Sequence, residues 1–312
     1  MLDGLPKISV LVITYNQEDL IKRAIDSLLA QKDYIYEICV SDDCSKDRTW
    51  DILQEYSAKY PGLFVLNRNE PNVGIFENIE KTWTMPTGDI IYQLSGDDEC
   101  GEGWFKKVVG FISDNNIDYQ NELFCIYGDF KCIYPNGDSC VIQNKRINSN
   151  QDTLKLATKG RIFNRSCCFS RHILEKYVNV SQGRSYMVEE AQDRQLQMFS
   201  EKSYYVSHVG NIYYARVGVS SNMSTTILNE RSNVYTYFSN FLKKQAFIVS
   251  HKVENFFKYK DSLAKGKYLK AFWLWIISME FSLKDIVVYY RKVYFAIFRR
   301  LPHKQPITDF RI

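Results

Sequence analysis

The sequence predicts an α/β fold in which helices flank a mostly parallel sheet. Short β-branched runs alternate with amphipathic segments through the first hundred residues, and this alternation favours parallel strands joined by crossover helices. The strand runs are apolar at consecutive positions, which is typical of strands buried on both faces. At 312 residues the chain suits one large domain or two modest ones. We expect an α/β domain over 1–224 and a helical, basic extension over 225–312.

The individual elements are predicted from the spacing of apolar residues and from the turn residues that separate the apolar runs. Strands are predicted at 7–14, 36–40, 63–66 and 90–94, and further strands at 123–127 and 131–134 precede a hairpin turn at 135–138. Apolar residues at helical spacing predict helices between the first four strands. Asp47 can cap the helix that begins near Trp50. A polar loop is expected at 143–158.

The charge of the chain is unevenly spread. The formal net charge is only +4. From residue 243 onward, however, 15 Lys and Arg face 5 Asp and Glu, a net of +10, and the remainder carries 25 basic and 31 acidic residues, a net of −6. Such asymmetry suggests one partner for the body of the protein and an anionic surface for the tail.

The eight cysteines indicate a reducing compartment. They form no CxxC motif and no Cys/His cluster, and we expect them to be reduced, mostly buried thiols. The first seven residues lack a basic segment followed by an apolar one, so no signal peptide is expected. The longest nearly apolar run, 271–279, is far shorter than the roughly 20 residues that cross a membrane. We therefore expect a cytoplasmic protein.

Polar residues gather where the predicted strands end. Thr14, Asp42–Asp43, Asn72 and Asp97–Asp98 all fall at such points, and open α/β sheets bind ligands at the carboxyl ends of their strands. Adjacent carboxylates repel unless a hard divalent cation, held together with substrate phosphates, offsets the repulsion. The alternative for Asp97–Asp98 is a solvated acidic turn.

Neither phosphate-binding glycine loop is present. The sequence has no GxGxxG and no GxxxxGK[ST], which argues against a dinucleotide dehydrogenase and a P-loop kinase. A nucleotide at this acidic edge therefore needs another means of neutralising its phosphates, and a metal ion on Asp98 would supply one.

Four stretches, in order, resemble the signatures of family 2 glycosyltransferases with a GT-A fold, of the type that builds bacterial polysaccharides and cell-surface glycans. They are 8–16, 40–49, 72–78 and 87–98. The resemblance implies a nucleotide-diphosphate sugar donor and Mn²⁺ or Mg²⁺. It assigns the base to Thr14, Tyr15 and Asp43, with Asp42 nearby, the ribose to Asp97 and the metal to Asp98. The remaining donor-site residues implied by it are Asn16, Asn72, Gly74 and Asn78.

The resemblance continues more weakly to about residue 224. The segment 160–169, with Arg161, resembles the lining of the sugar and acceptor pocket. The stretch 188–196 resembles the element that carries the general base, which makes Asp193 the candidate and Glu190, with Glu189, the fallback. The alternative is a solvated acidic helix start favoured by the helix dipole.

The chain also departs from the family pattern. It has Cys44 in place of the usual Gly, Ser95 where many members have the first Asp of the metal motif, Gln192 for Glu, and Gly218 where a His often completes the metal shell.

The resemblance implies an inverting, metal-dependent transfer of a sugar, with a UDP-sugar favoured as donor, to a glycan or lipid-linked acceptor in cell-surface polysaccharide synthesis. Two alternatives stay open. A sugar nucleotidyltransferase would use a related fold, although a Gly-rich basic loop after the first strand is missing. The other alternative is a nucleotide-sugar-binding protein without catalysis, because Ser95, Gln192 and Gly218 depart from the family pattern.

Beyond residue 225 aromatic residues are mixed with Lys and Arg, and two or three stretches suit amphipathic helices. These helices would pack on the catalytic domain or lie on the anionic inner face of a membrane, as a peripheral contact. Nucleic acid is not expected as a partner, because no recognised binding motif accompanies the basic residues.

Overall fold

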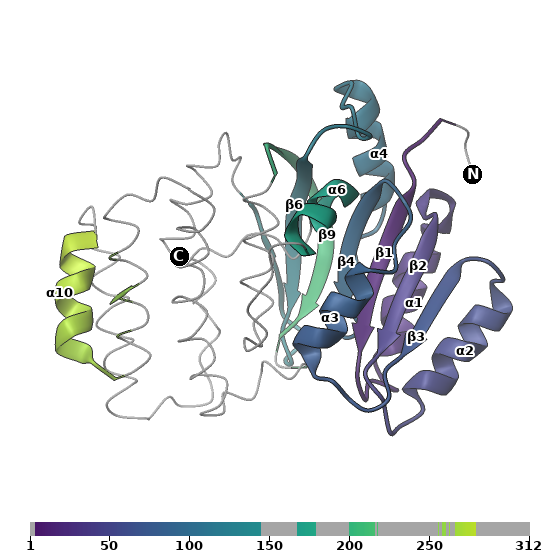
Figure 1. Ribbon diagram of the computed structural model, residues 1–312, viewed down its shortest axis with the longest axis horizontal. Helices are drawn as coiled ribbons and strands as arrows, with labels where there is room; N and C mark the ends of the chain where they lie inside the picture. Colours follow the sequence, from purple (N-terminus) through teal and green to yellow (C-terminus); the bar gives the residue numbers. More distant parts are fainter. Residues whose placement is uncertain are drawn as a thin grey trace. The chain divides into compact units, whose positions relative to one another are not determined.

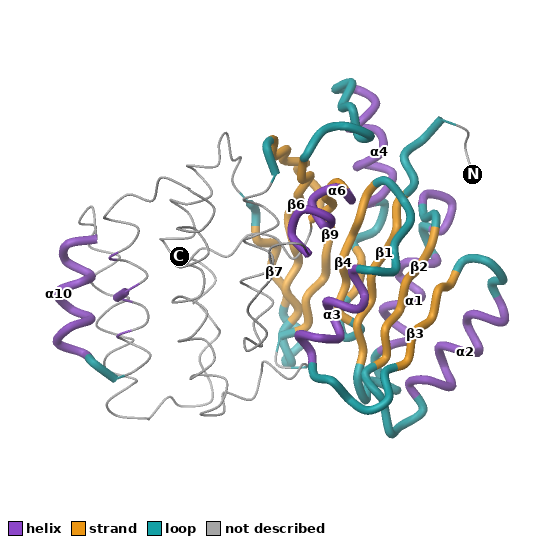
Figure 2. The backbone as a smooth tube through the Cα atoms, viewed as in Figure 1, coloured by secondary structure: helices purple, strands orange, loops and turns teal. Residues whose placement is uncertain are grey.

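The computed structural model describes residues 4–144, 167–178, 200–215, 217, 255, 258–259, 262 and 266–278 (Figures 1 and 2). Two compact units make up the chain. The first consists of Met1–Thr153, Phe163–Arg184 and Gln192–Asn222, and the second of Leu154–Ile162, Ser185–Ala191 and Met223–Ile312. The division expected at 224/225 stays a prediction.

Four parallel strands form one half of the sheet in the first unit. They stand in the order β3-β2-β1-β4, and every residue of β1 and β2 is buried. Burial on both faces explains the continuous apolar runs of the sequence. The strands are β1 (Ile8–Thr14), β2 (Glu37–Asp42), β3 (Phe64–Arg68) and β4 (Ile90–Ser95).

Helices cover both faces of this parallel half (Figure 1). The connections are α1 (Ile21–Leu29), α2 (Thr49–Lys59) and α3 (Ile75–Trp83). The chain runs from β1 to β2 to β3 in one direction and then returns to β4 on the other side of β1. Right-handed crossovers therefore place α1 and α2, which contact each other, on one face and α3 on the opposite face. The reversal makes the β1/β4 boundary a topological switch point, where such sheets bind ligands.

The other half of the sheet is mixed. β8 (Cys167–Ser170) pairs antiparallel with both β4 and β6 (Phe124–Ile133), and β9 (Lys202–Tyr214) runs parallel to β6. Two short strands complete it: β5 (Glu99–Cys100) on β9 and β7 (Ser139–Ile142) on β6. The other helices that the structure describes in this unit are η1 (Lys32–Tyr34), α4 (Trp104–Asp114) and α6 (Arg171–Val178).

One strand prediction was wrong. The separate strands expected at 123–127 and 131–134 are the single strand β6, and the pairing of β6 with β9 shifts register at Tyr127 to Phe130. Gly128 lies at that irregularity, where a Cβ atom would lie 2.5 Å from the carbonyl oxygen of His208 and 2.6 Å from the Trp104 ring. The glycine therefore permits close packing rather than ending a strand. The hairpin turn expected at 135–138 joins β6 to β7, as predicted.

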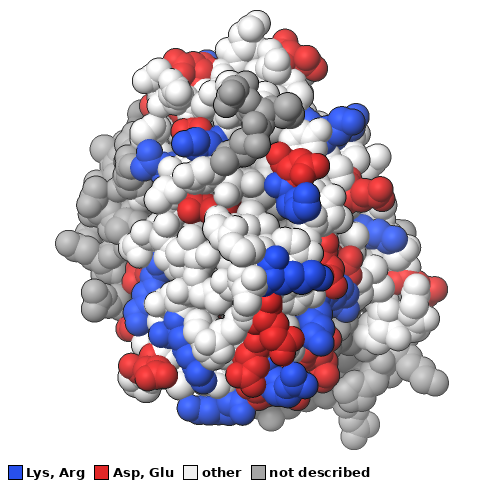
Figure 3. All heavy atoms as spheres, turned by 90° about the vertical axis from the view of Figure 1, so that its right-hand side faces the viewer, with Lys and Arg blue, Asp and Glu red and all other residues white. Residues whose placement is uncertain are grey.

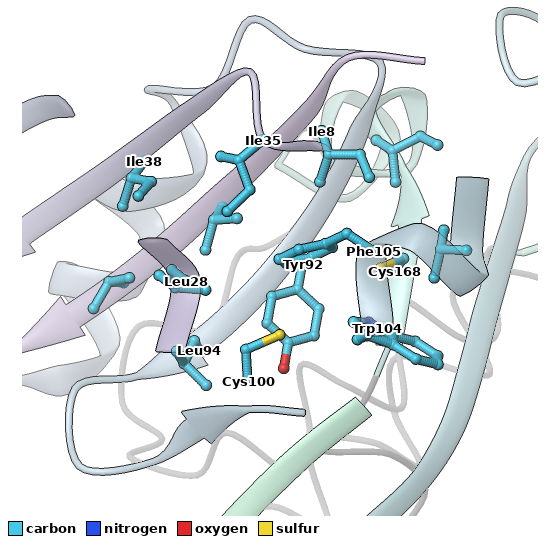
Figure 4. Packing of buried hydrophobic residues seen from close by; sticks show 14 of the residues in the cluster. Ile8, Leu28, Ile35, Ile38, Tyr92, Leu94, Cys100, Trp104, Phe105 and Cys168 are labelled. Carbon is cyan, nitrogen blue, oxygen red and sulfur yellow. The ribbon is translucent and has the colours of Figure 1, made fainter. Parts of the chain in front are cut away.

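The core of the first unit extends from β1, β2 and α1 of the parallel half to α4 and β6 of the mixed half, and Figure 4 shows part of it. Tyr92 of β4 is fully buried between Phe105 and Cys100, and its ring meets that of Phe105 edge to face at 5.2 Å. Its hydroxyl donates to the carbonyl oxygen of Gly210, 2.7 Å away, as a buried phenol requires. All eight cysteines are free and six of them are buried, as expected.

In the second unit the structure describes one long helix, α10 (Tyr268–Ser278). It confirms a helix within the region where two or three were expected. Among the residues described, no helix combines the length and apolarity needed to cross a membrane.

Candidate functional site

The ends of the parallel strands lie level at one edge of the sheet, here called the rim. Thr14 pairs with Asp42, and Ile13 pairs with Ser95. The Asp43 N–H donates to the Thr14 carbonyl oxygen at 3.0 Å, and the Gly96 N–H donates to the Ile13 carbonyl oxygen at 3.0 Å. The structure thus brings together the predicted residues after β1, β2 and β4. Asp42 is the last residue of β2 and not a loop residue.

The turn after β1 presents an aromatic ring at the rim. Tyr15 is 42% exposed, whereas the flanking Asn16 fastens this turn to the next one. The Asn16 N–H donates to Ser45 Oγ at 2.9 Å, and Asn16 Oδ1 accepts the Lys46 N–H at 2.8 Å. Thr14 Oγ1 donates to Gln17 Oε1 at 2.7 Å. Thr14 and Asn16 therefore shape the turn and leave the Tyr15 ring accessible.

Asp42 holds the turn that follows β2. Its side chain is fully buried and accepts both the N–H and the hydroxyl of Ser45, while Arg68 lies 3.7 Å away. Burial raises the pKa of Asp42, and the hydrogen bonds from Ser45 oppose that rise. Cys44 takes a left-handed backbone with φ of 62°, which explains why a Gly suits this position.

Asp43 organises the loop before α3. Its carboxylate accepts the N–H groups of Val73 and Gly74 at 2.9 and 2.8 Å, and the side-chain amide of Asn69 at 3.0 Å. The Asn72 amide donates to the Asp43 carbonyl oxygen at 2.7 Å. Gly74 has a φ of 86°, which a residue with a side chain rarely adopts. The predicted residues Asp43, Asn72 and Gly74 are thus one hydrogen-bonded unit at the rim.

Asn78 lies behind the rim and belongs to a buried network. Its amide oxygen accepts from the Ser41 hydroxyl at 2.6 Å and from Asn69 at 2.8 Å, and its amide nitrogen donates to the Ser41 carbonyl oxygen at 3.1 Å. Only 2% of the residue is exposed. Asn78 therefore fastens α3 to β2, and a direct contact with a nucleotide stays a prediction.

The turn after β4 carries Asp97 and Asp98. It closes through the Asp98 N–H, which donates to the Ser95 carbonyl oxygen at 3.0 Å. Asp98 is 3% exposed and accepts the Tyr214 N–H at 3.3 Å. A Cβ atom on Gly96 would lie 2.3 Å from Gln17 Oε1, so a side chain at this position would displace Gln17, which accepts from Thr14 Oγ1.

Arg23, on α1, contacts this turn and was not predicted from the sequence. Its guanidinium donates to the Asp97 carbonyl oxygen at 2.6 Å and pairs with Glu99 at 3.1 Å. It also lies 3.5 Å from the centre of the Tyr214 ring. Nothing in the spacing of a lone basic residue on a helix indicates which loop it reaches.

Tyr214 completes the arrangement around Arg23. Its hydroxyl donates to Glu99. Burial, together with that hydrogen bond to the Glu99 carboxylate, raises the pKa of Tyr214 to about 12, so the phenol keeps its proton at neutral pH. Arg23, Glu99 and Tyr214 together link α1 and β9 to the Asp97–Asp98 turn.

The residues of the rim are chemically suited to a divalent cation bound together with a diphosphate. No group of three His, Cys, Asp or Glu side chains capable of holding a metal occurs among the described residues. Mg²⁺ is nevertheless commonly bound through one or two carboxylates plus substrate phosphates, and Asp98 supplies a carboxylate at the switch point. The predicted residues Arg161, Glu190 and Asp193 lie outside the described residues, as do Glu189, Gln192 and Gly218.

The first unit presents mixed charge on the side viewed in Figure 3. Lys and Arg alternate there with Asp and Glu around an uncharged area. The described residues on this face thus form no continuous basic field of the kind that binds polyanions.

Curated relatives match about a third of the chain. The putative glycosyltransferase EpsE of Bacillus subtilis is 32% identical over 107 residues, which are 34% of this chain and 38% of that protein. The poly(ribitol-phosphate) beta-glucosyltransferase of Bacillus spizizenii is 32% identical over 114 residues, 36% of this chain and 18% of that protein. The matched part is thus well under half of either relative.

Solved structures share the fold over most of the chain. TarS 1–349 of S. aureus in complex with UDP-GlcNAc superposes with a TM-score of 0.63 at 16% identity, covering 92% of this chain and 79% of that one. The mannosyltransferase PcManGT of Pyrobaculum calidifontis, in complex with GDP-Man and Mn²⁺, gives 0.51 at 15% identity, covering 95% and 81%. These likenesses support the predicted GT-A-like α/β fold. The family model described as "Glycosyl transferase family 2" matches residues 9–177, more than half of the sequence, and the chain therefore belongs to the family 2 glycosyltransferases.

Proposed function

We propose that this protein transfers a sugar from a nucleotide-diphosphate donor to an acceptor hydroxyl, with inversion at the anomeric carbon. The observation that carries the proposal is the rim itself. At one switch point it combines the exposed Tyr15 ring, the loop held by Asp43, and the turn bearing Asp97 and Asp98. An aromatic face, hydrogen-bonding groups and adjacent carboxylates are what a base, a ribose and a metal-bound diphosphate require.

Each side chain has a distinct part in the proposal. The Tyr15 ring stacks on the base, with Thr14 and Asp43 beside it, and Asp97 accepts from the ribose hydroxyls. Asp98 would hold Mn²⁺ or Mg²⁺, which when bound offsets the negative charge of the diphosphate. Asp193, or Glu190 in its place, takes the proton of the acceptor hydroxyl. As that oxygen bonds to the anomeric carbon, the bond from this carbon to the diphosphate oxygen breaks, and the nucleoside diphosphate leaves with the bonding electrons.

The relatives narrow the substrates that we propose. TarS has been solved with UDP-GlcNAc and with UDP, PcManGT with GDP-Man and Mn²⁺, and the Bacillus spizizenii relative is named for a poly(ribitol-phosphate). We therefore favour a UDP-sugar donor. As acceptor we propose a glycan or a lipid-linked acceptor in cell-surface polysaccharide synthesis, and as location the cytoplasm with a peripheral contact at the inner face of the membrane.

The test is release of nucleoside diphosphate from UDP-GlcNAc, UDP-glucose and GDP-Man, with and without Mn²⁺. Wild type is expected to release UDP only with the metal, and Asp98→Asn is expected to lose this release while keeping its fold. Asp33→Asn is the matched control, because the Asp33 side chain is 83% exposed on η1. Equal release by Asp98→Asn and wild type would remove the metal assignment.

Two further measurements separate the alternatives. A sugar nucleotidyltransferase would release pyrophosphate from a nucleoside triphosphate and a sugar phosphate. A binding protein without catalysis would melt at a higher temperature with a nucleotide sugar, since a ligand at about a hundred times its dissociation constant adds about 2.7 kcal/mol of stability, and would release nothing.

A further inference from the structure

Several apolar side chains of α10, in the second unit, are exposed to solvent. Leu269, Trp273 and Ile277 are 79%, 60% and 53% exposed. Their spacing of four residues aligns them along one side of the helix, over about 12 Å. Phe272, 39% exposed, lies beside them. We refer to these four residues as the α10 stripe.

The opposite side of the same helix is packed. Ala271 is fully buried and Trp275 is 5% exposed, so α10 already has a buried face that fixes it within its unit. An ordinary surface helix is polar on its outer side, and exposed apolar patches commonly mark interaction sites. The α10 stripe therefore has the composition of a contact surface and not of a solvated one.

The exposed charged residues described beside the stripe are lysines. Lys267 and Lys270 are exposed, and the sequence from 262 to 279 contains three lysines, with the acidic Asp261 and Glu280 just outside it. The whole region from 243 to the end carries a net +10. A second copy of this chain would bring like charges together, whereas an anionic lipid surface would attract them.

We propose that the α10 stripe docks on an anionic lipid surface. Trp273 and its apolar neighbours enter the boundary between headgroups and acyl chains, and the lysines at the edge contact the lipid phosphates. The nearly apolar run 271–279 is about half the length that a membrane span needs, so we place α10 in the plane of the surface. This inference rests on the peripheral membrane location in the proposed function and names α10 as the element that makes the contact. Its test does not depend on sugar transfer.

The experiment is flotation of the full chain with vesicles of phosphatidylcholine alone or mixed with phosphatidylglycerol. Wild type is expected to float with the anionic vesicles at about 0.01 M salt and to lose most of this binding at about 1 M, because the Debye length falls from about 30 Å to about 3 Å. The double variant Leu269→Ala/Trp273→Ala and the double variant Lys267→Gln/Lys270→Gln are each expected to bind at least about tenfold more weakly.

A matched control separates the stripe from exposed apolar residues in general. Val141→Ala removes a side chain that is 51% exposed on β7 of the first unit, and it is expected to float like wild type. Near-ultraviolet circular dichroism and UDP release without vesicles check that each variant keeps its fold and its activity, so a failure of the proposed function remains distinct from a failure of docking.

Three results would overturn the proposal. Wild type would stay at the bottom of both gradients, or the Leu269→Ala/Trp273→Ala variant would float as well as wild type. The third is a dimer of wild type in light scattering that this variant converts to a monomer, since the stripe would then be an interface between copies of the chain.

Discussion

Replacing Arg23 by glutamine removes the cation that joins α1 to the Asp97–Asp98 turn. Three contacts are lost: the 2.6 Å hydrogen bond to the Asp97 carbonyl oxygen, the 3.1 Å pair with Glu99, and the stacking on Tyr214 at 3.5 Å. A hydrogen bond from a charged group contributes about 1.5–3 kcal/mol, and an exposed cation–π contact about 0.5–1 kcal/mol.

The exposure of Arg23 decides whether the lower or the upper values of these two free-energy ranges apply. Its side chain is 32% exposed, so solvent screens the pair with Glu99 and the low values hold. We expect Arg23→Gln to lose about 2 kcal/mol of unfolding free energy, which lowers the melting temperature by about 4–8 °C. The loosened turn is expected to lower kcat/KM for the donor about tenfold, or about 1.4 kcal/mol.

Arg48→Gln is the matched control for this prediction. Arg48 forms a 3.6 Å pair with Glu55 in which both side chains are about two-thirds exposed, and such pairs contribute little. The control should therefore have a melting temperature in differential scanning calorimetry, and a donor kcat/KM, close to those of wild type. An Arg23→Gln variant with the melting temperature and donor kcat/KM of the control would refute the role assigned to Arg23.

Three further predictions concern the rim and the base. Because burial raises the folded-state pKa of Asp42 above 3.8, the native state binds its proton more tightly than the unfolded chain, and wild type loses stability as pH rises from about that value. Asp42→Asn should therefore gain melting temperature relative to wild type with rising pH, and a constant difference across the acidic range would contradict this. Gly96→Ala should push Gln17 away from the turn after β1 and weaken nucleotide binding in a fluorescence titration, whereas unchanged affinity would show that the turn tolerates a side chain. Asp193→Asn should bind donor but lose about 10²–10⁴-fold in turnover, and activity in this variant with none in Glu190→Gln would move the base to Glu190.

The parallel half of the fold was predictable from sequence because its strands are buried on both faces. Apart from Ser9 and Glu37, the residues of β1 and β2 are apolar until the polar ends of the strands. The strands and their alternation with helices could therefore be predicted directly from the sequence. Their parallel pairing then places Thr14, Asp43 and Asp97 at one edge. Strand limits were less certain, and β3 ends two residues beyond its predicted limit, at Arg68.

Side-chain partners that join distant segments could not be predicted in this way. Arg23 reaches a turn more than seventy residues away, and Asn78 bonds to Ser41 of β2 inside the protein. Both depend on how helices pack on the sheet, which a single sequence does not encode as a local pattern. The continuity of β6 was missed for a related reason, since Gly128, which lies between the two strands predicted there, allows close packing against Trp104.

The central claim is that Asp98 brings a divalent cation to the diphosphate of the donor. Isothermal titration calorimetry of UDP, with and without Mn²⁺, tests it most directly in wild type and in Asp98→Asn. Because coupling between two ligands is reciprocal, Mn²⁺ should tighten UDP binding by about tenfold or more in wild type, and UDP should tighten Mn²⁺ binding equally. In Asp98→Asn the metal should leave the affinity for UDP unchanged, whereas the same enhancement in both proteins would contradict the account.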